Sequence, residues 1–227
     1  MNQQRIEDIQ LQESFLNRND INREFTLRHY FKFMMVRNPL HRLVSGYRSK
    51  VQRYPLTGLN DSRPHYNFLR KAVYLYTHPR EYAEYLRKRG RDEINITFSD
   101  FIDYWLQQPE EIKFDEHFRS MFKICQPCRT RFNFYANFKH FEADTQVLVD
   151  RINTRPEFIR AGYYSESDST ERLAPSLYAQ LTQTQKLAVL EQAKLDLDFY
   201  YHLFPEERGA HNSILGLDKA VPIPLDL

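Results

Sequence analysis

The pattern of apolar and polar positions first predicts a strand followed at once by a helix. Residues 31–36 form a short apolar run, interrupted by Lys32, of a length that suits a buried strand. Asn38 is a favourable N-cap, and Pro39 fits the first helical position, where a missing N–H costs nothing. The apolar face of this helix is predicted to be Leu40, Leu43, Val44, Tyr47 and Val51, and the polar face His41, Ser45 and Arg48.

The same kind of pattern predicts further elements downstream. Thr97 is placed to cap a helix, with Asp100 three residues later in the position of a capping box. The apolar face of that helix is Phe98, Phe101, Ile102 and Trp105. Residues 132–138 alternate as a strand does, and residues 142–152 follow as an amphipathic helix. The inward positions of the second helix are predicted to be Val147, Leu148 and Ile152.

The rest of the chain divides by composition. Residues 1–29 are polar and charged and indicate an arm that precedes one domain over residues 30–204. Residues 153–183 are polar and rich in turn formers, which favours a surface loop. A helix over residues 185–201 follows, and residues 205–227 are predicted to be a loop-like tail. The apolar positions of this last helix are Leu187, Leu190, Ala193, Leu197 and Tyr201.

Composition limits the possible functions. Hydrophobic residues make up 41% of the 227 residues, with 17 Phe and 15 Tyr, which suits a globular domain with its own core. A net charge of +2 is too small to favour binding of bulk nucleic acid, so an anion site must be local. The 6 glycines form no glycine-rich phosphate loop, and no apolar run approaches the ~20 residues that span a bilayer.

The first candidate site is the junction between the predicted strand and helix. Arg37 ends the strand just before a helix N-terminus, where free N–H groups and the helix dipole favour an anion. An arginine there can bind a phosphate with two parallel hydrogen bonds. Ser45 lies two turns along and can reach an anion that lies beside the helix. The alternative is an ordinary strand–helix unit whose arginines are solvated.

A second region of interest is basic and aromatic. Residues 50–92 carry many Lys and Arg side chains with tyrosines between them. One interpretation is a solvated insertion with aromatic anchors, and the other is a groove for a polyanionic chain. Two triplets that begin at Asn60 and Asn95 match the N-glycosylation sequon.

Two further clusters contain side chains that could take part in catalysis or binding. Asp115 and Glu116 precede His117, and a carboxylate beside a histidine can orient the ring for proton transfer. Cys125 and Cys128 are the only two cysteines. Their spacing is compatible with a redox pair or with half of a zinc site that needs two more ligands.

Residues 37–48 resemble the 3′-phosphate-binding motif of the Golgi carbohydrate sulfotransferases. The similar branch contains the chondroitin and dermatan 4-O-sulfotransferases and the HNK-1 sulfotransferase. The resemblance implies that Arg37 and Ser45 hold the 3′-phosphate of the sulfonate donor, PAPS. It makes the whole donor-binding motif Arg37, Asn38, Pro39, Leu40, His41, Arg42, Leu43, Val44 and Ser45. Asn38 replaces the family's usual Asp, and Gly46 replaces its usual Ala, which weakens the helix by up to about 1 kcal/mol.

Other blocks of the chain resemble the same family in order. Residues 115–118 are similar to its Asp-Glu-His-Trp element, with Phe118 in place of Trp, and imply His117 as a candidate base, with Glu116 and Asp115 as rivals. Cys125 and Cys128 are similar to its Cys-x-Pro-Cys element and imply a short-range disulfide in an oxidising lumen. Lys139 stands where the family often has Glu.

The resemblance implies an α/β domain of the P-loop-like sulfotransferase fold, a parallel sheet flanked by helices. We expect it to be N-terminally truncated, because residues 1–29 show no loop for the donor's 5′-phosphosulfate end. The implied activity is transfer of a sulfonate from PAPS to a hydroxyl of a glycosaminoglycan or glycoprotein glycan in the Golgi lumen. The resemblance implies no metal and no nucleic acid. It implies membrane attachment only through an anchor that is absent from this chain.

Two alternatives to an enzyme stay open. The first is a non-catalytic domain of the same fold that binds glycans or other polyanions. The second is a nucleotide-binding interaction module, which would bind PAP (adenosine 3′,5′-bisphosphate) with no affinity for glycans.

Overall fold

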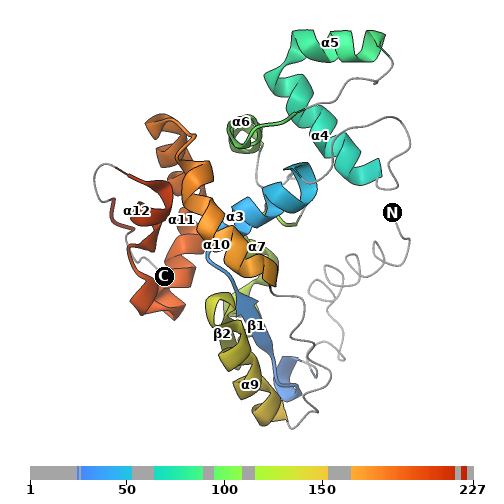
Figure 1. Ribbon diagram of the computed structural model, residues 1–227. Helices are drawn as coiled ribbons and strands as arrows, with labels where there is room; N and C mark the ends of the chain where they lie inside the picture. The colour runs from blue at the N-terminus through green and yellow to red at the C-terminus, as the bar shows by residue number, and fades with distance from the viewer. Residues whose placement is uncertain are drawn as a thin grey trace.

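A computed structural model describes residues 25, 27–52, 64–88, 95–108, 116–152, 165–217 and 221–223. Two strands and a larger number of helices make up this part of the chain (Figure 1). The elements of the first half are β1 (Phe33–Val36), α3 (Pro39–Tyr47), the π-helical turn η1 (Arg48–Gln52), α4 (Pro64–Thr77), α5 (Pro79–Arg87), α6 (Phe98–Gln107), α7 (Met121–Cys125) and α8 (Pro127–Thr130). The second half contains β2 (Phe134–Asn137), η3 (Phe138–His140), α9 (Phe141–Ile152), α10 (Ser165–Tyr178), α11 (Gln183–Leu203), η6 (Pro205–Glu207) and α12 (Ala210–Leu215).

The two strands pair in parallel, as the α/β prediction requires. Phe33 pairs with Phe134 and Val36 with Asn137, so both strands end at the same edge of the sheet. Each strand leads directly into a helix, α3 after β1 and α9 after η3 and β2. The predicted parallel sheet flanked by helices is therefore confirmed, with two strands among the described residues. In open α/β sheets the carboxyl edge of the strands is where ligands bind.

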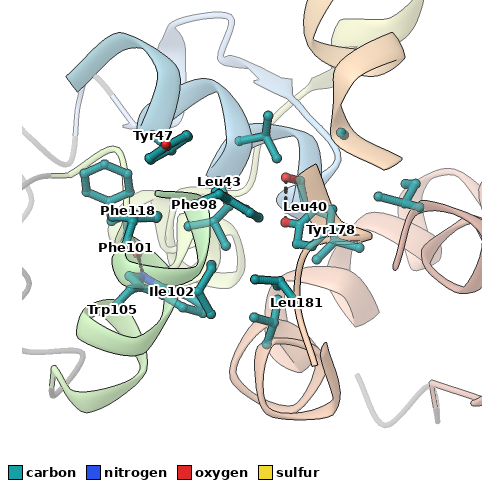
Figure 2. Close-up of a cluster of buried hydrophobic side chains, with 14 of the residues drawn as sticks. Leu40, Leu43, Tyr47, Phe98, Phe101, Ile102, Trp105, Phe118, Tyr178 and Leu181 are labelled. Atoms are coloured by element: carbon teal, nitrogen blue, oxygen red, sulfur yellow. Dashed lines mark hydrogen bonds between the residues drawn. The ribbon is translucent and has the colours of Figure 1, made fainter. Parts of the chain in front are cut away.

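Helix α3 is the centre of the core. Its predicted apolar positions are all buried, with Leu40 and Val44 completely inaccessible. Figure 2 shows how side chains from α6 and α10 meet those of α3 in one cluster. The cluster includes Phe98, Phe101, Ile102, Trp105, Tyr178 and Leu181. Full burial of each large apolar side chain contributes about 1.5–3 kcal/mol, so α3 is held firmly in place.

Local sequence signals set the helix starts. The Asn38 side chain accepts a hydrogen bond from the Leu40 N–H at 3.0 Å, which confirms the predicted N-cap of α3. Thr97 and Asp100 form the predicted capping box of α6, with both reciprocal hydrogen bonds present. Helix α11 begins in the same way, with Thr182 and Gln185.

The structure corrects several sequence predictions. Part of the predicted loop at residues 153–183 is helix α10, whose Tyr178 is completely buried. The tail predicted to be loop-like contains η6 and α12, and His211 of α12 is buried. The C-terminal residues fold back because Asn212 and His211 both bond the backbone of Val221.

Some side chains predicted to point inward are exposed instead. On α9 they are Val147 and Ile152, and on α11 Leu187. The buried residues of α9 are Thr145, Leu148 and Val149, so the buried face of this helix is rotated from the predicted one.

Helices α4 and α5 project from the rest of the molecule (Figure 1). Their tyrosines mostly contact one another: Tyr82 lies against both Tyr74 and Tyr85. Phe68 and Tyr76, by contrast, are about half exposed, at 55% and 48%. No helix among the described residues has both the length and the apolar content to cross a bilayer.

Candidate anion site at the carboxyl edge of the sheet

Arg37 lies at the carboxyl edge of the sheet, immediately after β1. Its guanidinium group stacks on the ring of Phe138, at 4.6 Å from the ring centroid, and Phe138 immediately follows β2. The Nε and Nη2 atoms are buried and have no hydrogen-bond partner among the described residues. Buried polar groups without partners are rare in folded proteins, and a charged one is costly. The arginine therefore has unused donors at the edge where a ligand is expected.

Burial lowers the pKa of Arg37 to about 10, and the charge of Glu171 opposes this shift. Arg48 and Arg42 lower the pKa further by repulsion. The guanidinium still carries its charge near neutral pH. An anion with several acceptor oxygens would supply both the missing hydrogen bonds and the missing counter-charge.

The predicted motif divides into two groups of residues. Asn38 caps α3, and the side chains of Pro39, Leu40, Leu43 and Val44 are buried. These residues fix the position of the helix, and their side chains are not available to a ligand. His41 and Ser45 lie one turn apart on the remaining face and are half-buried. The Ser45 hydroxyl makes no hydrogen bond to any described residue.

His41 is neutral near physiological pH. Burial lowers its pKa to about 4, with repulsion from Arg37 and Lys139 as further causes. Its Nδ1 atom lies 3.9 Å from a carboxylate oxygen of Glu171. Because the ring is uncharged and this distance exceeds that of a hydrogen bond, we do not count the contact as an ion pair.

Helix α10, predicted from the sequence as a loop, brings Glu171 to this site. Two hydrogen bonds hold α10 on the region of α3: Tyr178 Oη donates to the Leu40 carbonyl at 3.0 Å, and Arg48 Nη1 donates to Thr170 Oγ1 at 3.1 Å. Glu171 follows Thr170 directly. Neither Glu171 nor Phe138 was predicted as part of the site. An aromatic residue just after the second parallel strand was the available signal for Phe138.

Arg42 has a different role from Arg37. It donates hydrogen bonds to the backbone carbonyls of Glu116 and, at 2.6 Å, of Arg119. These bonds tie the turn at residues 116–119 to the first turns of α3. Phe118 of that turn is buried against Gly46, where a Cβ atom would lie 2.5 Å from the phenyl ring. The turn therefore packs on α3 through both an arginine and a glycine.

His117 lies on this turn and lines a small hollow of about 30 Å³. Arg42, Ser120 and Asp196 also line it. The Asp196 carboxylate accepts bonds from Ser120 Oγ and from the N–H groups at the start of α7. The His117 Nδ1 atom is 3.9 Å from a carboxylate oxygen of Glu116, and both side chains are more than a third exposed. Asp115 lies outside the described residues.

The two cysteines are free thiols, so the predicted disulfide between Cys125 and Cys128 is not formed in the structure. Cys125 ends α7 and packs against the core, whereas Cys128 lies in α8 and is exposed. The left-handed backbone of Gln126 separates the two helices. Burial raises the pKa of the Cys125 thiol. Among the described residues, no three His, Cys, Asp or Glu side chains gather to form a metal site.

The remaining predicted positions are placed as follows. Lys139 follows Phe138 and bonds Glu207 at 2.5 Å, which is the main cause of its raised pKa. Asn95 is exposed, as a glycosylation site must be, and Asn60 lies outside the described residues. The predicted lack of a 5′-phosphosulfate loop concerns residues 1–29, of which only 25 and 27–29 are described.

Comparison with known proteins gives a consistent result. Zebrafish (Danio rerio) carbohydrate sulfotransferase 14 is 30% identical over 134 residues, which cover 59% of this chain and 33% of that protein. Mouse (Mus musculus) carbohydrate sulfotransferase 11 is 24% identical over 79% of this chain and 49% of its own length. Human (Homo sapiens) carbohydrate sulfotransferase 9 is 26% identical over 77% of this chain and 36% of its own length.

The chain thus spans from under a third to about half of the length of the curated relatives that it matches. No solved structure is a significant match. The model of the "Sulfotransferase family" matches residues 2–202, which include both strands and the candidate anion site. Since this match covers most of its length, the chain belongs to the sulfotransferase family.

Proposed function

We propose that this chain takes part in the transfer of a sulfonate from PAPS to a hydroxyl group of a glycan. The observation that carries the proposal is the Arg37 side chain at the carboxyl edge of the sheet, whose buried Nε and Nη2 atoms lack partners among the described residues. The relatives' names add the kind of acceptor, because they are carbohydrate sulfotransferases.

Arg37 and Ser45 are the residues that would hold the 3′-phosphate of PAPS. The arginine can donate two parallel hydrogen bonds to phosphate oxygens, and the unused Ser45 hydroxyl can donate a third. PAPS supplies the activated sulfonate when it is bound. The part of this chain is to fix the nucleotide through α3, which the core holds rigidly.

His117 is the proposed base that accepts the proton of the acceptor hydroxyl. Its ring is partly exposed, so an acceptor can approach it, and it lies on the turn that Arg42 holds to α3. A positioned general base typically contributes 10²–10⁴-fold, so His117→Ala should lower kcat by about that factor.

An acidic glycosaminoglycan is the proposed acceptor, and the α4–α5 projection its proposed binding surface. Lys71 is half-buried, and Arg80, Arg87 and Lys88 are exposed. Exposed aromatic rings of Phe68 and Tyr76 can stack on sugar rings. Arg70, also basic, is buried and lies outside this surface. The Golgi lumen is the compartment where such acceptors meet PAPS, and we propose it as the site of action.

A transfer assay tests the proposal. The chain is incubated with PAPS labelled in the sulfonate group and with chondroitin or dermatan, and label in the glycan is measured. We expect transfer that is lost in Arg37→Gln. Binding of both PAP and chondroitin without transfer would instead support the non-catalytic alternative. Binding of PAP alone would support a nucleotide-binding module.

A further inference from the structure

The carboxyl edge of the sheet holds a carboxylate as well as an arginine, and neither one satisfies the other. Glu171 lies on α10, and its charge is the main influence that raises the pKa of Arg37 against the effect of burial. Yet no hydrogen bond or ion pair joins these two side chains, both of which are described. The two side chains carry opposite charges that influence each other without a direct bond.

The acceptor oxygens of Glu171 are unused by the described residues. The side chain is 32% exposed, and among the described residues its carboxylate comes within salt-bridge distance of His41 Nδ1 alone, at 3.9 Å. Since the His41 ring is uncharged near neutral pH, this contact supplies neither a counter-charge nor a hydrogen bond. The site thus offers unused donors on Arg37 and unused acceptors on Glu171.

The other basic side chains nearby have partners of their own. Lys139 Nζ bonds Glu207 at 2.5 Å, and Arg48 Nη1 bonds Thr170 Oγ1 at 3.1 Å. Their charges still reach the site, because Arg48 and Arg42 lower the pKa of Arg37 and Lys139 lowers that of His41. Repulsion from these cations disfavours a ligand ammonium group beside Glu171.

A ligand that fits both groups must carry a phosphate for Arg37 and, next to it, a neutral donor for Glu171. A hydroxyl on the neighbouring carbon meets this need, because it can donate to the carboxylate while the phosphate accepts from the guanidinium. A ribose 3′-phosphate has such a hydroxyl at its 2′ position. A phosphate without a neighbouring hydroxyl would face the Glu171 charge with no compensating bond.

We propose that Glu171 binds the ribose 2′-hydroxyl next to the phosphate held by Arg37, so that the site selects ribonucleoside 3′-phosphates over their 2′-deoxy counterparts. This inference rests on the proposed function and adds a residue that determines specificity. A hydrogen bond to a charged group contributes enough for a preference of ~10-fold or more.

Calorimetric titration of the full chain with adenosine 3′-phosphate and with 2′-deoxyadenosine 3′-phosphate tests the inference. We expect the ribonucleotide to bind ~10-fold tighter to the unaltered chain. In Glu171→Ala the two should bind equally, and inorganic phosphate should bind tighter, because a repelling charge has been removed. Glu171→Gln keeps an acceptor oxygen, so it should retain part of the ribose preference while it also gains affinity for phosphate.

The matched control is Glu191→Gln, at an exposed carboxylate of α11. It should leave the ribose preference and the phosphate affinity unchanged. Equal binding of the two nucleotides to the unaltered chain would overturn the inference even if the Glu171 variants did not fold, and would leave the proposed function intact. A preference that persists in Glu171→Ala would also overturn it. If neither nucleotide binds, the proposed function fails with it.

Discussion

Arg37 and Arg42 come from one short motif, yet they lie in regions of opposite character. The guanidinium of Arg37 is stacked on Phe138 at the carboxyl edge of the sheet, and its Nε and Nη2 atoms bond to none of the residues that the structure describes. The guanidinium of Arg42 is bonded to two backbone carbonyls of the turn at residues 116–119. The comparison shows that one motif supplies both an arginine with unbonded donors, among the described residues, and an arginine whose donors bind the backbone.

The difference follows from what each region provides. A structural arginine needs fixed acceptors, and the 116–119 turn presents two carbonyl oxygens. At the sheet edge the Glu171 carboxylate on α10 influences the charge of Arg37, but these two described side chains share no hydrogen bond or ion pair. Substitutions at the sheet edge should therefore affect ligand binding, whereas substitutions at the 116–119 turn should affect stability.

The largest effect is expected at Arg37. Arg37→Gln should weaken PAP binding by ~100-fold or more, because two charge-assisted hydrogen bonds are lost. The free energy of unfolding should stay the same or rise, because a buried charge without partners is removed. Calorimetry with PAP and urea unfolding measure the two quantities. A large loss of stability with unchanged binding would mean that Arg37 is structural, and the comparison would fail.

Arg42→Ala should show the reverse pattern. The loss of its bonds to the turn should lower the free energy of unfolding by about 2 kcal/mol, while the PAP affinity of the folded chain changes little. Urea unfolding and PAP calorimetry at equal folded concentration measure this. Arg129→Ala is the matched control, because that arginine is exposed and its loss should lower the free energy of unfolding far less. A loss of PAP affinity as large as that of Arg37→Gln would contradict the assigned roles.

The next effect depends on pH. The folded-state pKa of His41 is about 4, below the ordinary value of 6.5, so the unfolded chain takes up a proton that the native chain excludes. Stability should fall as the pH decreases from 6.5 towards 4. Between about pH 7 and 5, His41 should account for a fall of about 2 kcal/mol in the free energy of unfolding. His41→Gln should remove this part of the pH dependence.

Urea unfolding of both chains across this pH range checks the prediction. Because Arg37 is one cause of the low pKa, Arg37→Gln should also reduce the pH dependence, whereas burial should preserve part of it. Parallel curves for the unaltered chain and His41→Gln would show that His41 is not shielded from protons in this way.

The smallest effect is expected at Gly46, in the region of the turn. Alanine normally stabilises a helix by up to about 1 kcal/mol over glycine. Here the new Cβ would lie 2.5 Å from the Phe118 ring, so Gly46→Ala should lower the free energy of unfolding by about 1 kcal/mol. In a Phe118→Leu background the same change should become neutral or stabilising. If Gly46→Ala stabilised the otherwise unaltered chain, the Phe118 ring would not pack closely against Gly46 of α3.

Local signals in the sequence were sufficient for the elements around α3. The N-cap at Asn38, the buried face from Leu40 to Val51 and the capping box at Thr97 are all confirmed, because each depends on residues within a few positions of one another. The parallel pairing of the two strands is also confirmed.

The surroundings of the two arginines depend on contacts between distant residues, and these could not be predicted. Helix α10 has a polar sequence with an internal Pro175, typical of a loop, and tertiary contacts through Tyr178 and Thr170 hold it in place. Nothing local assigns Glu171 to the site. The carbonyl acceptors of Arg42 belong to the backbone, which carries no sequence signal at all.

The measurement that tests the central claim most directly is a binding cycle between Arg37 and the 3′-phosphate of the nucleotide. PAP and adenosine 5′-phosphate are titrated into the unaltered chain and into Arg37→Gln. The account predicts that PAP binds ~100-fold tighter than adenosine 5′-phosphate to the unaltered chain, and that this advantage disappears in the variant. Equal affinities for the unaltered chain, or a PAP advantage that survives without Arg37, would contradict it.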